Sequence, residues 1–129
     1  MIHAAFLLCL FACVGAQLPG GASSQDPNSP EIMAKVWGAV PQLNEASNDG
    51  TDNVIPIKVL NVTSQVVAGE LWTVTVLVGQ STCPRATVSA SEVTQENCAV
   101  KEGGDREIYT ITVLEQPWLN NNQYTVTKV

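Results

Sequence analysis

The spacing of apolar residues changes near Gly50, and this change constrains the fold more than any other feature of the sequence. Before it, apolar residues recur at steps of four, four and three, as on one face of an α-helix: Ile32, Val36, Val40 and Leu43. After it, apolar and polar residues alternate, as in strands with one buried face. A single amphipathic helix followed by strands predicts an α+β fold, in which the helix packs across an antiparallel β-sheet.

The predicted helix has a recognisable start and an interruption. Residues 28–31, Asn-Ser-Pro-Glu, combine a capping side chain, a first-turn proline and an acidic residue near the positive end of the helix dipole. Pro41 lies inside the apolar stripe, where it removes a backbone donor and clashes with the carbonyl of Trp37. We therefore expect a kinked helix that continues to about Ala46, with an end at Val40 as the alternative.

Four runs of strand-like sequence follow the helix. They cover residues 55–67, 71–78 and 107–114 and a last run that carries Tyr124 and Val126. In the first run we expect Leu60 and Val62 on the same face. The alternation in the next two runs predicts these inward residues: Trp72, Val74, Val76, Val78, Tyr109, Ile111 and Val113. A long connection over residues 81–105 separates the second run from the third.

The first 16 residues have the composition of a secretory signal peptide. The apolar run at residues 4–14 would rise only about 16 Å as a helix, roughly half of a bilayer core. Small residues follow at 14–16, as before a signal-peptidase site. A membrane anchor is the alternative, but no basic flank or stop-transfer segment supports it. We therefore expect residues 1–16 to be removed and residues 17–129 to form one secreted, extracellular domain.

Charge and residue types exclude several function classes for residues 17–129. All 6 basic and all 12 acidic residues lie in this part, so the net charge stays at −6. That acidity argues against nucleic acid and anionic membranes as partners. The one histidine, His3, lies in the signal segment, and the common hydrolytic triads, dyads and zinc sites need an imidazole. We expect no enzyme activity, no cofactor and no metal.

Removal of the signal segment leaves two cysteines, Cys83 and Cys98. They allow one intramolecular pairing, which would stabilise the fold by about 3 kcal/mol in the chain-entropy description. Free thiols are unexpected outside the cytosol, and a metal site would need two further ligands that nothing nearby supplies. The sequence therefore predicts a disulfide between them.

Two of the expected strand connections are unusually apolar. Residues 65–69 read Gln-Val-Val-Ala-Gly, and residues 116–119 read Gln-Pro-Trp-Leu. Hairpin tips normally carry Asn, Asp, Gly and Ser. In an antiparallel meander both tips lie at the same end of the sheet, where they would form an apolar edge suited to a partner. The alternative is that Val66 and Val67 only extend the strands while Trp118 packs down on a neighbour.

A short apolar arm follows the expected cleavage site. It reads Leu18-Pro19-Gly20-Gly21, and its glycines allow the arm to reorient toward a surface. The alternative is a disordered terminus with incidental glycines.

Taken in order, these features resemble the cystatins, specifically the secreted type 2 cysteine-protease inhibitors. The family motif Gln-x-Val-x-Gly is matched by Gln65, Val67 and Gly69, behind Gly20 in the arm and ahead of the cysteine pair and a Pro-Trp dipeptide. The resemblance covers the whole of residues 17–129. It implies a cystatin-like fold and reversible, tight-binding, competitive inhibition of papain-like proteases of the cathepsin type.

The resemblance also assigns roles, because in cystatins the arm and both tips form a wedge that enters the protease cleft. It implies contacts from Leu18, Pro19, Gly20, Gln65, Val66, Val67, Ala68, Gly69, Pro117 and Trp118. The arm would occupy non-primed subsites, with Gly20 as its joint. The first tip would straddle the cleft, and Trp118 would pack on the primed side.

A second inhibitory site is implied after the helix. Ser47-Asn48-Asp49 matches the segment of those cystatins that also inhibit legumain, so Asn48 would fill the specificity pocket of that asparaginyl endopeptidase. A plain polar loop is the alternative. A calcium loop with Gly50 in sixth place would put Pro56 where the final Glu is required, so that reading fails.

Several features depart from the family pattern or leave alternatives open. Type 2 cystatins commonly carry a second disulfide, and Tyr109 and Val129 stand at those positions. Asn61 begins an Asn-Val-Thr sequon on the expected polar face of a strand, where N-glycosylation and an unmodified strand residue are the two alternatives. We expect a monomer, with hairpin-opening domain exchange as an alternative assembly. A secreted cystatin-fold module that binds other molecules without inhibiting proteases is the alternative function.

Overall fold

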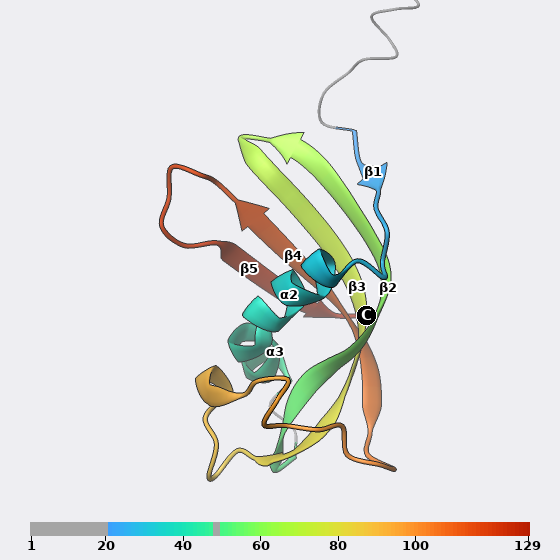
Figure 1. The fold of residues 1–129 in the computed structure, drawn as a ribbon, viewed down its shortest axis with the longest axis vertical. Helices are drawn as coiled ribbons and strands as arrows, with labels where there is room; N and C mark the ends of the chain where they lie inside the picture. Colours follow the sequence, from blue (N-terminus) through green and yellow to red (C-terminus); the bar gives the residue numbers. More distant parts are fainter. Residues whose placement is uncertain (1–20, 48–49) are drawn as a thin grey trace, which may run out of the picture.

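The computed structural model describes residues 21–47 and 50–129 and contains one antiparallel sheet of five strands in the order β1-β2-β3-β4-β5 (Figure 1). The strands are β1 (Ser23–Ser24), β2 (Asp52–Val67), β3 (Gly69–Pro84), β4 (Arg106–Glu115) and β5 (Gln123–Lys128). Each strand pairs with the next one along the chain, so the sheet is a meander. The predicted α+β fold is confirmed.

Two short helices, α2 (Pro30–Gly38) and α3 (Val40–Ala46), lie across one face of the sheet (Figure 1). Helical structure reaches Ala46 as predicted, but it divides at Ala39, whose φ of −95° and ψ of 4° depart from helical values. Pro41 sits in the first turn of α3, where no backbone donor is required. The chain thereby avoids the clash of a mid-helix proline by starting a second helix. Among the described residues, no helix is long and apolar enough to cross a membrane.

The core lies between the helices and the inner face of the sheet. The apolar stripe of α2 and α3 supplies Ile32, Val36 and Leu43, all buried. The alternation predicted for residues 71–78 and 107–114 is confirmed in β3 and β4. These two strands contribute Trp72, Val74, Val76, Val78, Tyr109, Ile111 and Val113 to the core. Burying this many branched and aromatic side chains is the main term that stabilises a domain of this size.

The prediction for the inner face of β2 is wrong in one detail. Val62 is fully buried, but Leu60 is exposed and Val59 is buried instead. The pairing with β3 shifts between Val59 and Asn61, which is a β-bulge. The extra residue turns Leu60 and Asn61 together toward solvent, so simple alternation fails there. Asn61 of the sequon is exposed.

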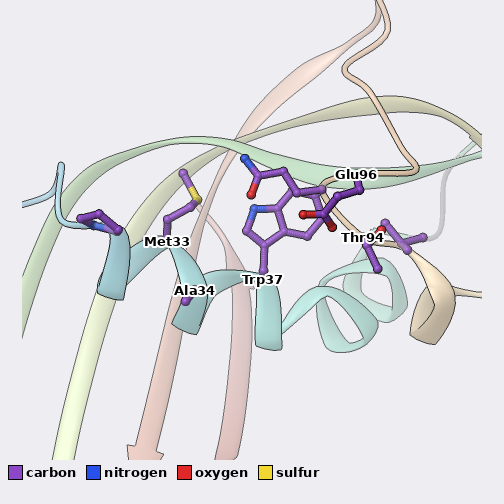
Figure 2. Close-up of a pocket in the computed structure, with 8 residues that line it drawn as sticks. Met33, Ala34, Trp37, Thr94 and Glu96 are labelled. Carbon is purple, nitrogen blue, oxygen red and sulfur yellow. The ribbon is translucent and has the colours of Figure 1, made fainter.

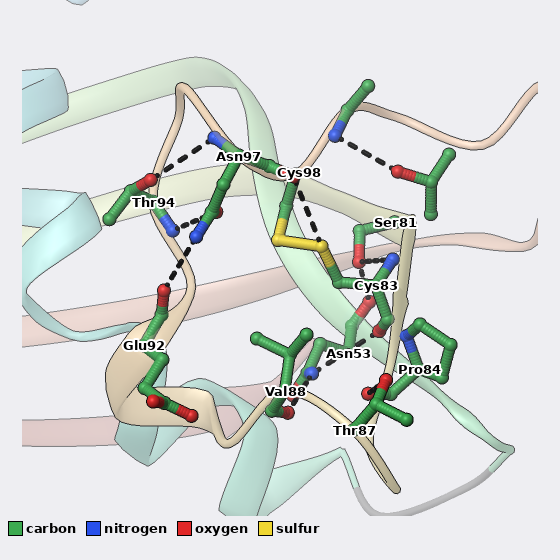
Figure 3. Close-up of a disulfide and its surroundings, with 12 residues drawn as sticks. Asn53, Ser81, Cys83, Pro84, Thr87, Val88, Glu92, Thr94, Asn97 and Cys98 are labelled. Carbon is green, nitrogen blue, oxygen red and sulfur yellow. Dashed lines mark hydrogen bonds between the residues drawn. A yellow bond between two sulfur atoms is a disulfide. The ribbon is translucent and has the colours of Figure 1, made fainter.

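The predicted disulfide between Cys83 and Cys98 is confirmed, with a Cα–Cα distance of 5.6 Å (Figure 3). Next to it, the buried side chain of Asn53 donates hydrogen bonds to the carbonyls of Cys83 at 3.3 Å and Val88 at 2.8 Å. The Ser81 hydroxyl donates to the Asn53 carbonyl at 2.7 Å. This end of the sheet is therefore fixed by one covalent bond and by satisfied buried polar groups.

Candidate functional site

The two apolar connections lie at the same end of the sheet. The first tip (residues 65–69) closes the hairpin of β2 and β3, which bends at Ala68 between Val67 and Gly69. The second tip (residues 116–119) directly follows β4, and Glu115 of β4 pairs with Glu70 of β3. The second tip therefore begins beside the first, toward the upper end of Figure 1.

The tips contact each other directly. The side-chain amide of Gln116 donates a hydrogen bond of 2.9 Å to the carbonyl of Ala68. Gly69 has a φ of +111°, and a Cβ built on it would lie 2.4 Å from the carbonyl oxygen of Glu115. Only glycine allows both this backbone conformation and this close approach. The motif glycine therefore sets how near the two tips can come.

The tips present apolar side chains to solvent. Val66 is 65% exposed and Trp118 is 64% exposed, and Val67 and Leu119 are also exposed. Val66 and Val67 belong to β2, but this does not bury them, and Trp118 does not pack down on a neighbour. Together they form a narrow exposed apolar edge of the kind that usually meets a partner.

The described N-terminal segment runs beside the first tip. Ser23 of β1 pairs with Ser64 of β2, immediately before the tip begins. The side chain of Gln25 donates to the Ser64 hydroxyl at 2.9 Å, and its backbone amide donates to the Val62 carbonyl at 2.9 Å. Leu18, Pro19 and Gly20 of the expected arm lie outside the described residues.

The loop after α3 is held on both flanks. Ser47 is buried, and Arg85 donates from its guanidinium to the Ser47 carbonyl and, at 3.1 Å, to the Asn44 carbonyl. The backbone amide of Arg85 donates to the carbonyl of Thr51 at 2.8 Å on the other side of the loop. Asn48 and Asp49 lie outside the described residues.

This loop lies at the opposite end of the sheet from the tips, because it joins the start of β2 while the first tip closes its end. The described flanks of this loop, Ser47 and Thr51, are therefore separated from the two tips by the length of the sheet. The structure brings the two tips together and does not bring the loop to them.

A groove between α2 and the segment after the short helix η1 (Ala90–Glu92) was not anticipated from the sequence (Figure 2). Its volume is about 540 Å³. It is lined by Pro30, Met33, Ala34, Trp37, Val93, Thr94, Gln95 and Glu96. The spacing of its helical members, at steps of three, one and three, forms a second apolar stripe on α2 that would have indicated it.

Electrostatics single out no further site among the described residues. No group of three or more His, Cys, Asp or Glu side chains in residues 21–47 and 50–129 is placed to hold a metal ion. The Ser89 hydroxyl, and then the Ser89 backbone amide, lower the pKa of the Glu92 carboxyl by donating hydrogen bonds to it. This exposed pair caps η1 and has no part in the tips.

Comparison with known proteins places this fold in a family. A cystatin-domain family model matches residues 20–129. Cystatin cpi-1 of Caenorhabditis elegans is 43% identical over 117 residues, which cover 90% of this chain and 82% of that protein. Onchocystatin of Onchocerca volvulus is 36% identical over 103 residues, which cover 80% of this chain and 62% of that protein.

A solved structure shares the architecture. The crystal structure of a salivary cystatin from the soft tick Ornithodoros moubata superposes with a TM-score of 0.73 at 22% identity, covering 87% of this chain and 99% of that one. That likeness supports the fold, and the family model and the sequence relatives support the family. The chain therefore belongs to the cystatin family, and the relatives that it matches are named as inhibitors and not as enzymes.

Proposed function

We propose that residues 17–129 are secreted after removal of residues 1–16 and act as a monomeric, reversible, competitive inhibitor of papain-like cysteine proteases of the cathepsin type. The observation that carries this proposal is the pair of exposed apolar tips, joined at one end of the sheet by the Gln116–Ala68 hydrogen bond. An edge of this shape fits a cleft between two walls, as in a papain-like active site.

The two tips and the arm contact different parts of the protease cleft. Gln65, Val66, Val67, Ala68 and Gly69 straddle the cleft over the catalytic thiol, while Pro117 and Trp118 pack on the primed side. Leu18 and Pro19 enter the non-primed subsites, with Gly20 as the joint that keeps a scissile peptide from the thiol. Protease–inhibitor interfaces of this kind bury about 1,600 Å² in total.

Trp118 is the expected centre of binding energy. Its indole is largely exposed in the free protein, so a partner can remove most of its surface from water. Aromatic anchors dominate interface energetics, and truncation of such a side chain costs about 2 kcal/mol or more. The tips are already fixed in the free protein by strand pairing and by the Gln116 bond, so little ordering entropy opposes binding.

The test is a titration of papain with residues 17–129 and the Trp118→Ala variant. We expect the wild-type domain to inhibit, and the variant to bind at least about 30-fold more weakly. Leu60→Ala is the matched control, because it truncates an exposed apolar side chain on β2 away from the tips. Unchanged inhibition by Trp118→Ala would contradict the assignment of the tips, and no inhibition by the wild type would contradict the proposed function.

We also propose a second, separable site that inhibits legumain through Ser47, Asn48 and Asp49, with Asn48 as the substrate-like residue. Two observations support a separate site. Arg85 fixes both flanks of this loop, and the loop lies at the other end of β2 from the first tip.

Asn48→Ala should abolish legumain inhibition and leave papain inhibition unchanged. Trp118→Ala should weaken papain inhibition as described above and leave legumain inhibition unchanged, so it is the control in the same pair of inhibition assays. Loss of both activities in either variant would contradict the separation of the two sites.

A further inference from the structure

A network of charged and aromatic side chains joins α2 to the last residue of β4. The ammonium nitrogen of Lys35 lies 2.5 Å from Oε2 of Glu115. The other carboxylate oxygen of Glu115 accepts a hydrogen bond of 3.1 Å from the indole nitrogen of Trp72. The Lys35 ammonium also lies 4.7 Å from the centre of the Trp72 ring, within the range of a cation–π contact.

This network is shielded from water. The side chain of Lys35 is 14% exposed and that of Glu115 is 27% exposed, while Trp72 belongs to the buried core. A pair in this setting is screened less by salt than a surface pair. Removing one partner leaves the other charge poorly solvated, which favours a local rearrangement.

Glu115 is also the residue at which the two tips meet. Its backbone carbonyl faces Gly69 at the close approach described above, and the next residue, Gln116, donates to Ala68. A movement of Glu115 therefore shifts the start of the second tip relative to the first. The side chain of Glu115 fixes the same residue to α2 through Lys35.

We propose that Lys35 and Glu115 are positioning residues for the protease-binding edge: their ion pair, braced by Trp72, holds the second tip at the distance from the first that a cleft requires. The inference rests on the proposed inhibitory function. Lys35 offers too little surface to contribute much direct contact, so it acts on binding through the backbone of Glu115 and the tips that follow.

The test compares Lys35→Met, Glu115→Gln and the double variant in papain inhibition. Methionine removes the charge but keeps an unbranched apolar side chain of similar length, and glutamine keeps an acceptor for the indole. Each single variant should weaken inhibition about tenfold, mainly through faster dissociation. The double variant should be no weaker than the worse single variant, because the two residues act as one unit. Lys35→Arg, which keeps the positive charge, should retain most of the wild-type affinity for papain.

The matched control is Lys101→Met, which breaks the ion pair of Lys101 with Asp52, 2.9 Å long, at the other end of the sheet. If the Lys35–Glu115 pair has a purely structural role, Lys35→Met, Glu115→Gln and Lys101→Met should each lower the melting temperature, and none of them should change papain affinity. The positioning role predicts that only the Lys35 and Glu115 variants lose papain affinity, while their legumain inhibition is kept.

The outcomes separate this inference from the function on which it depends. If the wild-type domain inhibits papain but Lys35→Met and Glu115→Gln inhibit equally well, or if their losses add in the double variant, the positioning role is overturned and the inhibitory function stands. If the wild-type domain does not inhibit, the proposed function itself fails.

Discussion

The two ends of the sheet are built in opposite ways. At the tip end, apolar side chains face solvent and the backbone is held by hydrogen bonds and one ion pair. At the other end, a disulfide crosses a long connection, and buried polar side chains satisfy one another (Figure 3). The first end keeps apolar surface available for a partner, whereas the second uses its strongest bonds internally.

This contrast indicates a division between binding and stability. Surface that is exposed in the free protein adds little to folding but much to association, while a covalent cross-link does the opposite. Changes at the disulfide end should therefore alter stability with little effect on papain inhibition. Changes at the tip end should alter papain inhibition with little effect on stability.

The largest expected effect comes from removing the disulfide with Cys83→Ser and Cys98→Ser together. The free energy of unfolding should fall by about 3 kcal/mol, since the cross-link restricts the unfolded chain. Denaturant unfolding measures this loss. Papain inhibition at 25 °C should stay within about twofold of wild type while the variant remains folded. A parallel loss of inhibition under those conditions would contradict the division between the two ends.

Gly69→Ala should give the next largest effect, at the tip end. A Cβ at residue 69 would be strained at this positive φ and would clash with the Glu115 carbonyl, so the tips must move apart. We expect this displacement to reduce the free energy of papain binding by about 2 kcal/mol. We expect papain inhibition to weaken by about 30-fold, as measured by the inhibition constant.

Gly103→Ala is the control for backbone conformation. Gly103 also has a positive φ, of +74°, but a Cβ there meets nothing within 4 Å. It should lose some stability and no papain affinity. Equal loss of affinity in both glycine variants would show that strain, and not the spacing of the tips, is responsible.

Glu92→Gln should give the smallest effect, confined to the disulfide end. The pKa of Glu92 is lowered in the folded state, so its contribution to stability is present above the unfolded pKa and is lost as the pH falls through the folded pKa. The variant should melt slightly below wild type at neutral pH, and the difference should disappear in acid. A difference that grows in acid would contradict the assigned direction. Papain inhibition should not change.

Local patterns in the sequence predicted most of the fold. Two patterns reflect which side chains face the core: the apolar stripe of residues 32, 36 and 43, and the alternation in β3 and β4. The pairing of Cys83 with Cys98 was predicted by counting, because the expected removal of residues 1–16 would leave only these two cysteines. The apolar composition of the tips left two readings open, exposure or packing on a neighbour, and the structure shows Val66 and Trp118 exposed.

What the sequence left open depends on contacts between distant residues. The bulge at Val59–Asn61 depends on how β2 pairs with β3, and the break at Ala39 depends on how the chain accommodates Pro41. The pairing of Lys35 with Glu115 joins residues 80 positions apart, and no local pattern indicates it. Such features become visible only when the elements are assembled.

The pairing of β2 with β3 has a consequence for the survival of the protein beside a protease. Nicking usually occurs at loops whose backbone is free to adopt an extended, unpaired conformation. Here Val66 pairs with Glu70 and Val67 pairs with Gly69, so the ladder continues almost to the bend. The backbone is therefore already paired in the free protein, and we expect this hairpin to resist cleavage if a protease binds it as proposed.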